Sequence, residues 1–446
     1  MKSTKSPAGG NPSAGLSRAV ITAALAISLF AGGALTFAAT TRRHERVDEP
    51  AVGSAVGSRG AHGIATLQAR LKQVPRDVRA WAALGFAYVQ QARISGDPSY
   101  YPKAERALHR SLALEGRRND DAMIAMGALA AARHDFADAL MWGERARSVD
   151  PYNATALGVI GDALVELGRY PEAFATIQKM NDLRPDLASY TRASYAWELR
   201  GNAGNAKRAL DFASEAAVTP SDAAFVAYYL GELSWNAGRV SEALSMYRQS
   251  AARDPNFVPA YQGIAKADAA QGHLVRAIEQ YQTVVARLPL PQYVIELADL
   301  YTLAGEPARA SEQVALLHAQ ERLFRANGVN VDVEIALFDA DHGIDVADGL
   351  AAAEREWSKR RSVFVADALA WSLYANGRYS EALAYSKQSL RIGTRNALLL
   401  FHKGMIERAL GLREAARRDL RAALAVNPHF SFLWAPKLPA ILEGLR

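Results

Sequence analysis

The sequence predicts an all-α solenoid, and three observations lead to that prediction. Eight glycines recur along the chain: Gly168, Gly201, Gly238, Gly272, Gly305, Gly343, Gly377 and Gly411. The steps between them are 33, 37, 34, 33, 38, 34 and 34 residues, and a period of about 34 residues is typical of a helix–turn–helix repeat. Apolar residues recur between the glycines at the spacing of one helix face, and turn residues interrupt them regularly, which excludes one long helix or a coiled coil.

The repeat pattern is expected to span residues 64–430, with residues 62–75 forming a lone leading half-repeat. Small Gly and Ala residues at fixed places allow paired helices to approach closely, Gly between helices takes positive φ, and Pro ends the second helix of a unit. The residues that carry the pattern are Trp81, Leu84, Gly85, Tyr88, Ala104 and Leu108 in unit one; Gly127, Ala139, Ala146 and Pro151 in unit two; Leu157, Ile160, Gly161, Gly168, Tyr170, Ala173 and Pro185 in unit three; Trp197, Gly201, Ala206, Leu210 and Ala213 in unit four; Leu230, Gly231, Gly238, Ala243, Tyr247 and Pro255 in unit five; Tyr261, Ile264, Ala265, Gly272, Ala277, Tyr281 and Pro289 in unit six; Leu297, Ala298, Tyr301, Gly305 and Ala310 in unit seven; Ala336 and Gly343 in unit eight; Leu369, Ala370, Gly377, Tyr379 and Ala382 in unit nine; and Gly404, Gly411, Ala416, Ala423 and Pro428 in unit ten.

Two parts of the array depart from the pattern. The second helix of unit seven is expected to continue through Arg325, and unit eight is degenerate over residues 329–362. Residues 431–446 are expected to form a C-terminal cap, because the last unit of such an array needs a cover for its apolar face.

These residues resemble the tetratricopeptide repeat family, in which a bulky residue, Leu-Gly and Tyr are followed by Ala, an aromatic or Leu, Ala and a closing Pro. The resemblance covers about four-fifths of the chain. It implies a right-handed superhelical solenoid of about ten helix–turn–helix units. It also implies that the first helix of each unit lines a concave surface that holds a protein or an extended peptide.

The composition excludes several classes of function. The chain of 446 residues has no cysteine, which excludes disulfides, thiolate metal sites, a cysteine nucleophile and lipid attachment through cysteine. Seven basic and three acidic side chains give residues 1–60 a net charge of +4, which leaves +2 of the total of +6 for residues 61–446. We therefore expect no nucleic-acid partner, because neutralisation of phosphates dominates such binding.

The N-terminus is predicted to be a membrane or export segment. Residues 19–41 form a run of 23 residues without a charged side chain, and a helix of about 20 residues crosses the hydrocarbon core of a membrane. Residues 1–18 form a basic leader, and residues 42–63 form a flexible linker. Two interpretations stay open: a transmembrane anchor, which the length favours, and a cleaved signal peptide with its cut at Thr36-Phe37-Ala38.

The position of this segment gives an expectation about location. The basic leader favours a bacterial-type, membrane-anchored protein whose array lies outside the cytoplasm, and a cleaved, secreted form stays an alternative. The Lys and Arg residues at the two ends of the segment are similar in number, so they do not decide the orientation.

The candidate peptide-binding groove follows from the faces of the first helices. It consists of Tyr195, Tyr228, Glu232, Trp235, Lys266, Asp299, Trp371, Tyr374 and Phe401. Exposed aromatic side chains anchor peptides because they bury much apolar area at little cost in entropy. The alternative is that several of them pack between adjacent units. The clamp of Lys, Asn and Arg with which some family members grip a terminal carboxylate is absent, since Ala82, Phe86 and Arg192 stand at the relevant places.

Other clusters carry weaker indications. Asp339, Asp341, His342 and Asp345 crowd one turn, but their spacing does not fit a calcium loop, and a polar turn between helices is favoured. HExxH, phosphate-loop and nucleophile-elbow motifs are absent from the sequence. The two basic groups are interpreted as polar outer faces, with contact to an anionic lipid or partner as the alternative: Arg355, Lys359, Arg360 and Arg361, and Arg413, Arg417, Arg418 and Arg421.

The sequence thus predicts a non-enzymatic scaffold that binds a protein or peptide in its concave groove and organises a complex at the cell envelope. We expect neither a cofactor nor a metal, and no small-molecule substrate. The main alternative is a fixed structural subunit of a larger membrane-associated machine that uses its outer faces and caps. An enzyme with an active site assembled in the groove is a third possibility, but no motif supports it.

Overall fold

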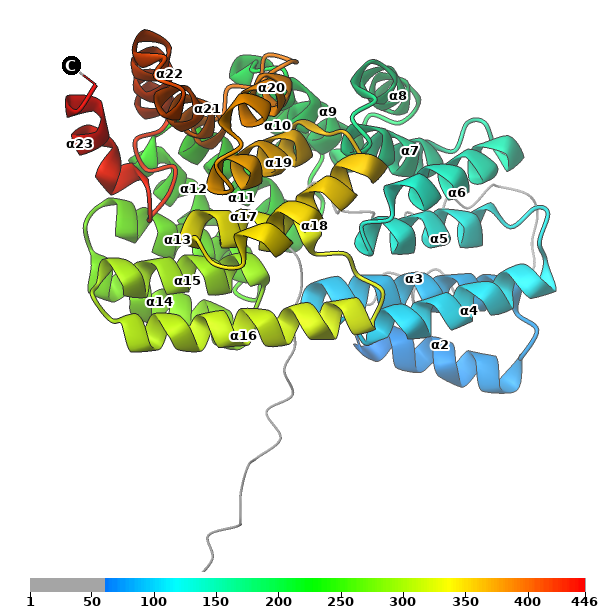
Figure 1. Ribbon diagram of the computed structural model, residues 1–446. Coiled ribbons are helices and arrows are strands. Elements are labelled where there is room, and N and C mark those ends of the chain that lie inside the picture. Colours follow the sequence, from blue (N-terminus) through cyan, green and yellow to red (C-terminus); the bar gives the residue numbers. More distant parts are fainter. Residues whose placement is uncertain (1–60, 446) are drawn as a thin grey trace, which may run out of the picture.

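The part of the chain that the structure describes is all-α, as the glycine period predicts (Figure 1). The structure is a computed structural model, and it describes residues 61–445. Within that range the chain forms 22 α-helices and one short 3₁₀ helix, without a β-strand. The described chain is therefore a helical-repeat solenoid.

A leading helix is followed by ten antiparallel helix pairs. The leading helix is α2 (Ala61–Gln73), which begins shortly before the expected start of the array at residue 64. The pairs are α3 (Val78–Ser95) and α4 (Tyr100–Leu114); α5 (Asp120–Ala132) and α6 (Phe136–Val149); α7 (Ala154–Glu166) and α8 (Tyr170–Leu183); α9 (Leu187–Leu199) and α10 (Ala203–Glu215); α11 (Pro220–Asn236) and α12 (Val240–Arg253); α13 (Val258–Ala270) and α14 (Leu274–Arg287); α15 (Pro291–Leu303) and α16 (Pro307–Ala326); α17 (Asp332–His342) and α18 (Val346–Lys359); α19 (Val363–Ala375) and α20 (Tyr379–Ser389); and α21 (Ala397–Ala409) and α22 (Arg413–Val426).

Small residues permit the close contact within each pair. The repeated alanine of the second helix is fully buried in units one to six and in units nine and ten: Ala104, Ala139, Ala173, Ala206, Ala243, Ala277, Ala382 and Ala416. A Cβ atom on Gly231 of α11 would lie 2.5 Å from Cε1 of Tyr247 on α12. Gly therefore stands at this position because a larger residue would force the two helices apart.

The eight glycines of the period all stand in the turns between paired helices. Their φ angles lie between 65° and 83°, a region that Gly enters at little cost and other residues avoid. Unit one uses Gly96 in the same conformation, and unit two uses His134, with φ of 61°. The predicted role of these positions is confirmed.

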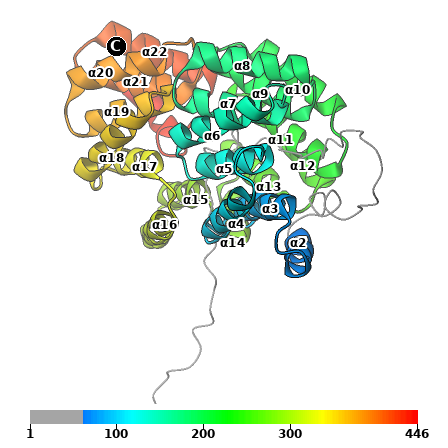
Figure 2. The same ribbon diagram turned by 90° about the vertical axis from the view of Figure 1, so that its right-hand side faces the viewer.

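The array closes on itself, because its units wind around a common axis until a second superhelical turn meets the first (Figure 1, Figure 2). First helices of neighbouring units contact one another, as α3 does with α5 and α17 with α19, which places them on the inner side of the curve. The second turn contacts the first through the loops that precede α17, α19 and α21. Asn330 N donates to Arg133 O at 3.1 Å, and Thr394 Oγ1 donates to Leu199 O at 2.7 Å, across 195 positions in sequence.

The degenerate region is where the chain passes from the first turn to the second. As expected, α16 runs on without a break past Arg325. Phe324, Val329 and Val331 then enter a buried core that contains Leu129 of α5. Unit eight thus packs against units one and two as well as against its own neighbours, so its apolar residues do not follow the repeat pattern.

Of the segments expected at the two ends of the chain, the structure describes mainly the C-terminal one. The basic leader, the 19–41 segment and almost all of the 42–63 linker lie outside the described residues. Among the helices of residues 61–445, none is long and apolar enough to cross a membrane. The C-terminal cap comprises a turn-rich stretch, the 3₁₀ helix η2 (Ala435–Lys437) and α23 (Leu438–Glu443). Leu438 and Leu445 are buried against α21 and α22.

Candidate protein-binding groove

Four of the expected groove residues meet on α11 and α13. Lys266 Nζ donates to Glu232 Oε1 at 2.8 Å and lies 4.7 Å from the centre of the Trp235 ring. Tyr247 on α12 donates its hydroxyl to the same carboxylate oxygen at 2.5 Å. Tyr228 packs edge-to-face against a neighbouring tyrosine and Phe257. The first helices of units five and six thus share one polar and aromatic cluster.

Three other expected residues meet on α19 and α21. Trp371 stacks on Tyr374, with ring centres 4.5 Å apart and planes 4° from parallel. The opposite face of Trp371 stacks on His402, at 4.1 Å. Phe401 lies 5.9 Å from Trp371, and Trp371 Nε1 donates to Asp341 Oδ1 at 2.8 Å. We call the four residues Asp341, Trp371, Tyr374 and Phe401 the aromatic floor.

Asp299 and Tyr195 have other partners. Asp299 of α15 pairs with His342 of α17, with 3.0 Å between Oδ1 and Nε2. Burial lowers the pKa of His342, but the hydrogen bond and charge of Asp299 outweigh burial, and the net shift of the pKa is upward. Tyr195 of α9 packs against the core of units three and four, where burial raises its pKa well above the ordinary value.

Four of the six expected aromatics are buried, and the other two, Tyr195 and Tyr374, are half-buried. Tyr228 and Trp235 are 5% and 7% exposed, and Trp371 and Phe401 are 0% exposed. Side chains this deeply buried cannot meet a ligand unless something above them moves. The burial of these four aromatics agrees with the alternative that they pack inside the protein. Peptide binding by the groove stays a prediction.

The chain's own C-terminal segment, residues 427–437, covers the aromatic floor. Phe430 and Trp434 lie 5.1 Å and 5.5 Å from Phe401, measured between ring centres. Trp434 packs edge-on to Trp371 and donates its Nε1 to Asp341 Oδ1 at 2.7 Å. Both indoles therefore share one carboxylate oxygen.

The same segment reaches across to the first superhelical turn. His429 lies 6.3 Å from Trp235 of α11, and Phe432 lies 6.1 Å from Tyr281 of α14. The sequence predicts only that residues 431–446 cap the last unit. The signal that points further is the density of aromatic rings at His429, Phe430, Phe432 and Trp434, because a simple cap needs one apolar face and not two.

A buried charge cluster joins the two superhelical turns, and the sequence pattern does not reveal it. Arg360, which follows α18, donates to Glu166 of α7 at 2.9 Å and to Glu356 at 2.8 Å. Burial raises the pKa of Glu334, whose two carboxylate oxygens are buried near this cluster, to about 7, against the opposing effect of Arg360. Burial and then the charge of Arg360 lower the pKa of His134 to about 3.

The structure also places the clusters to which the sequence gave weaker indications. Of the first basic group, Arg360 is buried in the joint, Arg355 pairs with Asp332, and Lys359 pairs with Glu356. Arg417 and Arg418 of the second group pair with acidic residues of α22. Of the acidic turn at residues 339–345, Asp341 accepts from two indoles and His342 pairs with Asp299, and the described residues contain no group of three or more ligands that could hold a metal.

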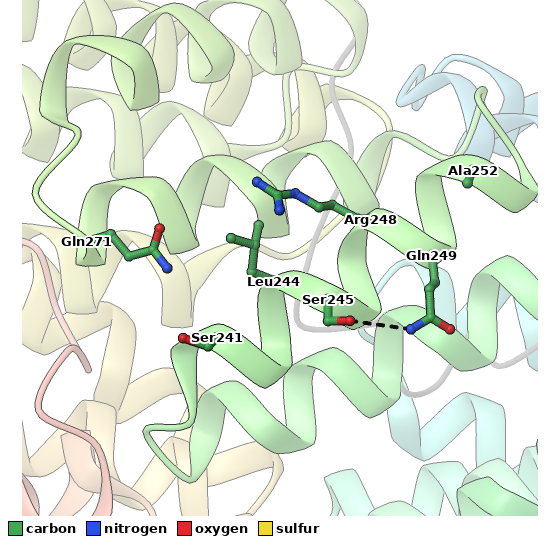
Figure 3. Close-up of a pocket in the computed structure, with 7 residues that line it drawn as sticks. All are labelled: Ser241, Leu244, Ser245, Arg248, Gln249, Ala252 and Gln271. Atoms are coloured by element: carbon green, nitrogen blue, oxygen red, sulfur yellow. Dashed lines mark hydrogen bonds between the residues drawn. The ribbon is translucent and has the colours of Figure 1, made fainter.

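A shallow hollow of about 490 Å³ lies beside α12 on the outer surface (Figure 3). Its lining residues are Ser241, Leu244, Ser245, Arg248, Gln249, Ala252 and Gln271. Gln249 turns back along its own helix toward Ser245, at the limit of hydrogen-bond distance. The hollow lies on the side of the helix pair away from the expected groove residues of α11.

Comparison with known proteins gives structural neighbours only. No family model and no curated protein match the chain. Among solved structures, the human IFIT1 dimer with PPP-AAAA is similar at 15% identity and a TM-score of 0.47, over 84% of this chain and 88% of that one. The APC/C hetero-tetramer Cut9-Hcn1 is similar at 15% identity and a TM-score of 0.39, over 86% and 82% of the two chains.

A third neighbour is a tetratricopeptide repeat protein from Parabacteroides merdae, at 16% identity and a TM-score of 0.34, over 59% of this chain and 99% of that one. The solved structures that this chain resembles thus include tetratricopeptide repeat proteins. Identities this low transfer neither a partner nor an activity.

Proposed function

We propose that this protein is a non-enzymatic protein-binding scaffold that organises a complex at the cell envelope of a bacterial-type cell. In this proposal residues 19–41 tether the chain to the membrane and the array lies outside the cytoplasm. The uncharged run of 23 residues supports the tether. A net charge of only +2 over residues 61–446 supports a protein partner over a nucleic acid.

The observation that carries the proposal is the way in which the inner face of α19 and α21 holds polypeptide. Residues Phe430–Trp434 are not helical, and they attach to that face through ring contacts and through one carboxylate that accepts an indole N–H. A surface that binds irregular backbone through aromatic side chains has the chemistry needed to bind a segment of another protein.

The joint between the superhelical turns supports the same proposal. Arg360 holds α7 and α18 together, and Thr394 ties the loop before α21 to α9. The inner face is thereby fixed in shape before a partner arrives, which reduces the entropy that binding costs.

A fixed structural subunit is the second candidate function, and the outer surface favours it. Phe212 and Met141 on the second helices of units four and two are 52% and 42% exposed, and the hollow beside α12 adds a concave outer site. In that case the partner contacts the outer helices, and the locked turns serve only to keep the subunit rigid.

Site-specific photo-crosslinking separates the two candidates. A photoreactive residue is placed in the full-length chain in native membranes, either at Arg408, which is exposed at the end of α21, or at Gln249 in the outer hollow. We expect one protein to crosslink from Arg408 and not from Gln249. The reverse pattern supports the structural subunit, and no crosslink from either position contradicts both.

The tether is tested on the same material. We expect the chain to stay with membranes through alkaline carbonate extraction, and its N-terminal peptide to be intact in mass spectrometry. A soluble chain that begins just after residue 38 would identify the 19–41 segment as a cleaved signal instead.

A further inference from the structure

We propose that the C-terminal segment, residues 427–437, is a displaceable self-ligand, and that the partner binds the aromatic floor with a segment of similar chemistry. The inference rests on the proposed function, because it specifies what the inner face recognises. It goes further in two respects: it names the class of ligand, a segment with phenylalanines and a tryptophan, and it makes the chain's own end a competitor for the site.

The layering of side chains supports displacement. Trp371, Phe401 and Tyr281 are completely buried, whereas His429, Phe430 and Trp434 above them are only partly buried. The segment is therefore the outermost layer, and lifting it would uncover aromatic side chains of both superhelical turns. A soluble protein does not leave such a surface open without a partner to cover it.

The attachment of the segment relies on side chains. Its described backbone hydrogen bonds are local: Asn427 N donates to Ala423 O of α22, Ala435 N to Ser431 O, and Lys437 N to Trp434 O. The backbone of the segment thus satisfies itself without help from α19 or α21. The segment can leave the floor without breaking a backbone hydrogen bond to α19 or α21.

The ends of the segment stay anchored when it leaves. On one side α22 packs against α21, and on the other side Leu438 and Leu445 are buried in the core of the last units. The displaced segment therefore stays tethered at a high effective concentration, so it competes with a partner without dissociating.

Asp341 makes the floor selective for an indole. Its Oδ1 accepts from Trp371 at 2.8 Å and from Trp434 at 2.7 Å. A ligand without an N–H in the place of the Trp434 indole would leave this buried oxygen with one donor fewer, and such a loss is costly. The partner segment should therefore place a tryptophan where Trp434 lies, with apolar aromatic residues beside it as Phe430 and Phe432 lie.

The first arm of the test measures release of the segment in the full chain. The chain has no cysteine, so the substitution Pro436→Cys, at an exposed position of the segment, carries a single fluorophore. An unlabelled peptide with the sequence of residues 427–437 is added. We expect the anisotropy of the fluorophore to fall with peptide concentration, and no change from a fluorophore at Tyr152→Cys, which is 76% exposed in the loop after α6.

The second arm measures selectivity and competition. When phenylalanine replaces the tryptophan of this peptide, a concentration at least about tenfold higher should be needed for the same fall in anisotropy. The reason is that phenylalanine cannot donate a hydrogen bond to Asp341. A full chain with Trp434→Ala should bind the labelled peptide at least about tenfold more tightly than the parent chain does, because its own segment competes less. Tyr152→Ala should behave as the parent, and circular dichroism confirms that each variant folds.

The outcomes decide the inference separately from the proposed function. If neither the parent nor folded Trp434→Ala binds the peptide, the segment is a fixed cap and the inference is overturned. The proposed function still stands in that case if Arg408 crosslinks to a partner. If the peptide binds with tryptophan selectivity but no partner crosslinks from Arg408, the self-ligand is real and the scaffold proposal fails.

Discussion

Arg360 and Glu166 form an ion pair of 2.9 Å across 194 positions of sequence, and this contact joins the two superhelical turns. The guanidinium of Arg360 is 4% exposed and also pairs with Glu356 at 2.8 Å. The guanidinium carbon of Arg360 lies 4.9 Å from the centre of the Phe136 ring. Each of these partners belongs to a different helix, so one side chain holds α6, α7 and α18 together.

Loss of the Arg360 guanidinium should destabilise the joint strongly. Arg360→Met leaves the buried carboxylates of Glu166 and Glu356 without their common cation, and breaking a buried pair from one side typically costs about 3–5 kcal/mol. Urea unfolding followed by circular dichroism measures the change. Arg378→Met is the matched control, because Arg378 pairs with Glu381 at the exposed surface, where an ion pair contributes little to stability, so its loss should be much smaller. Equal losses in the two variants would show that the buried ion pairs of Arg360 contribute no more to stability than an exposed pair does.

The glycines of the repeat should differ in their tolerance of alanine. A Cβ atom on Gly168 would lie 2.5 Å from the carbonyl carbon of Arg361, whereas nothing lies within 4 Å of a Cβ atom on Gly272. Both residues have positive φ, so Gly→Ala strains the backbone in each by a similar amount, about 1–2 kcal/mol.

The difference between these two variants isolates the contact between superhelical turns. We expect Gly168→Ala to be less stable than Gly272→Ala by a further ~1–3 kcal/mol, the typical cost of overpacking. Thermal and urea unfolding of both variants measure it. Gly201→Ala, where a Cβ atom would meet the carbonyl oxygen of Gly393, should behave like Gly168→Ala.

Glu334 should make stability depend on pH. Burial raises its pKa from 4.5 to about 7 in the folded state, so between these values the folded chain keeps a proton that the unfolded chain has lost. The free energy of unfolding therefore falls as pH rises through this window, by an amount on the order of 3 kcal/mol.

Glu334→Gln removes this titration and keeps the shape of the side chain. The variant and the parent should have similar unfolding free energies near pH 4.5, and the variant should be the more stable one at pH 8. Urea unfolding of both chains at each pH measures the difference between their unfolding free energies. Other titrating groups such as His134 are present in both chains, so their contributions cancel in this difference. A difference that does not change with pH would show that Glu334 is ionised in the folded state throughout.

Lys266 should be more important for stability than an exposed lysine with a similar partner. Its side chain is 8% exposed and that of Glu232 is 19% exposed, so Lys266→Met leaves a mostly buried carboxylate with only the Tyr247 hydroxyl. We expect a loss of about 2–4 kcal/mol in urea unfolding. Lys207→Met is the control, because Lys207 pairs with Asp211 on an exposed helix face and should lose about 0.5 kcal/mol or less.

Sequence patterns were sufficient for the local structure of the array. The glycine period predicts the turns at Gly168 and Gly272 alike, the run of helix past Arg325 follows from the missing turn residues, and a cap after residue 430 follows from the need to cover the last unit. These features depend on backbone preferences and on packing between neighbouring helices, and both recur within about 34 residues.

The surroundings of the candidate groove residues depend on contacts that the sequence pattern does not contain. Trp371, Tyr374 and Phe401, taken from the same offsets along the first helices, lie together in the structure, because residues at equal places in adjacent units lie side by side. The offsets could not show that Trp434 would cover them, since that contact depends on where the chain's end arrives after ten units.

The sequence by itself determined that the described chain is an all-α repeat array, which residues pack within each unit, and where its turns lie. Only the tertiary structure decided that Gly168 is pressed against the second superhelical turn while Gly272 is open, that Arg360 is a buried joint and not an outer-face charge, and that the aromatic floor is covered. The physical reason is that each unit turns by a small angle relative to the one before. That angle accumulates over almost 200 residues before the turns meet, so the contacts between turns carry no local signature.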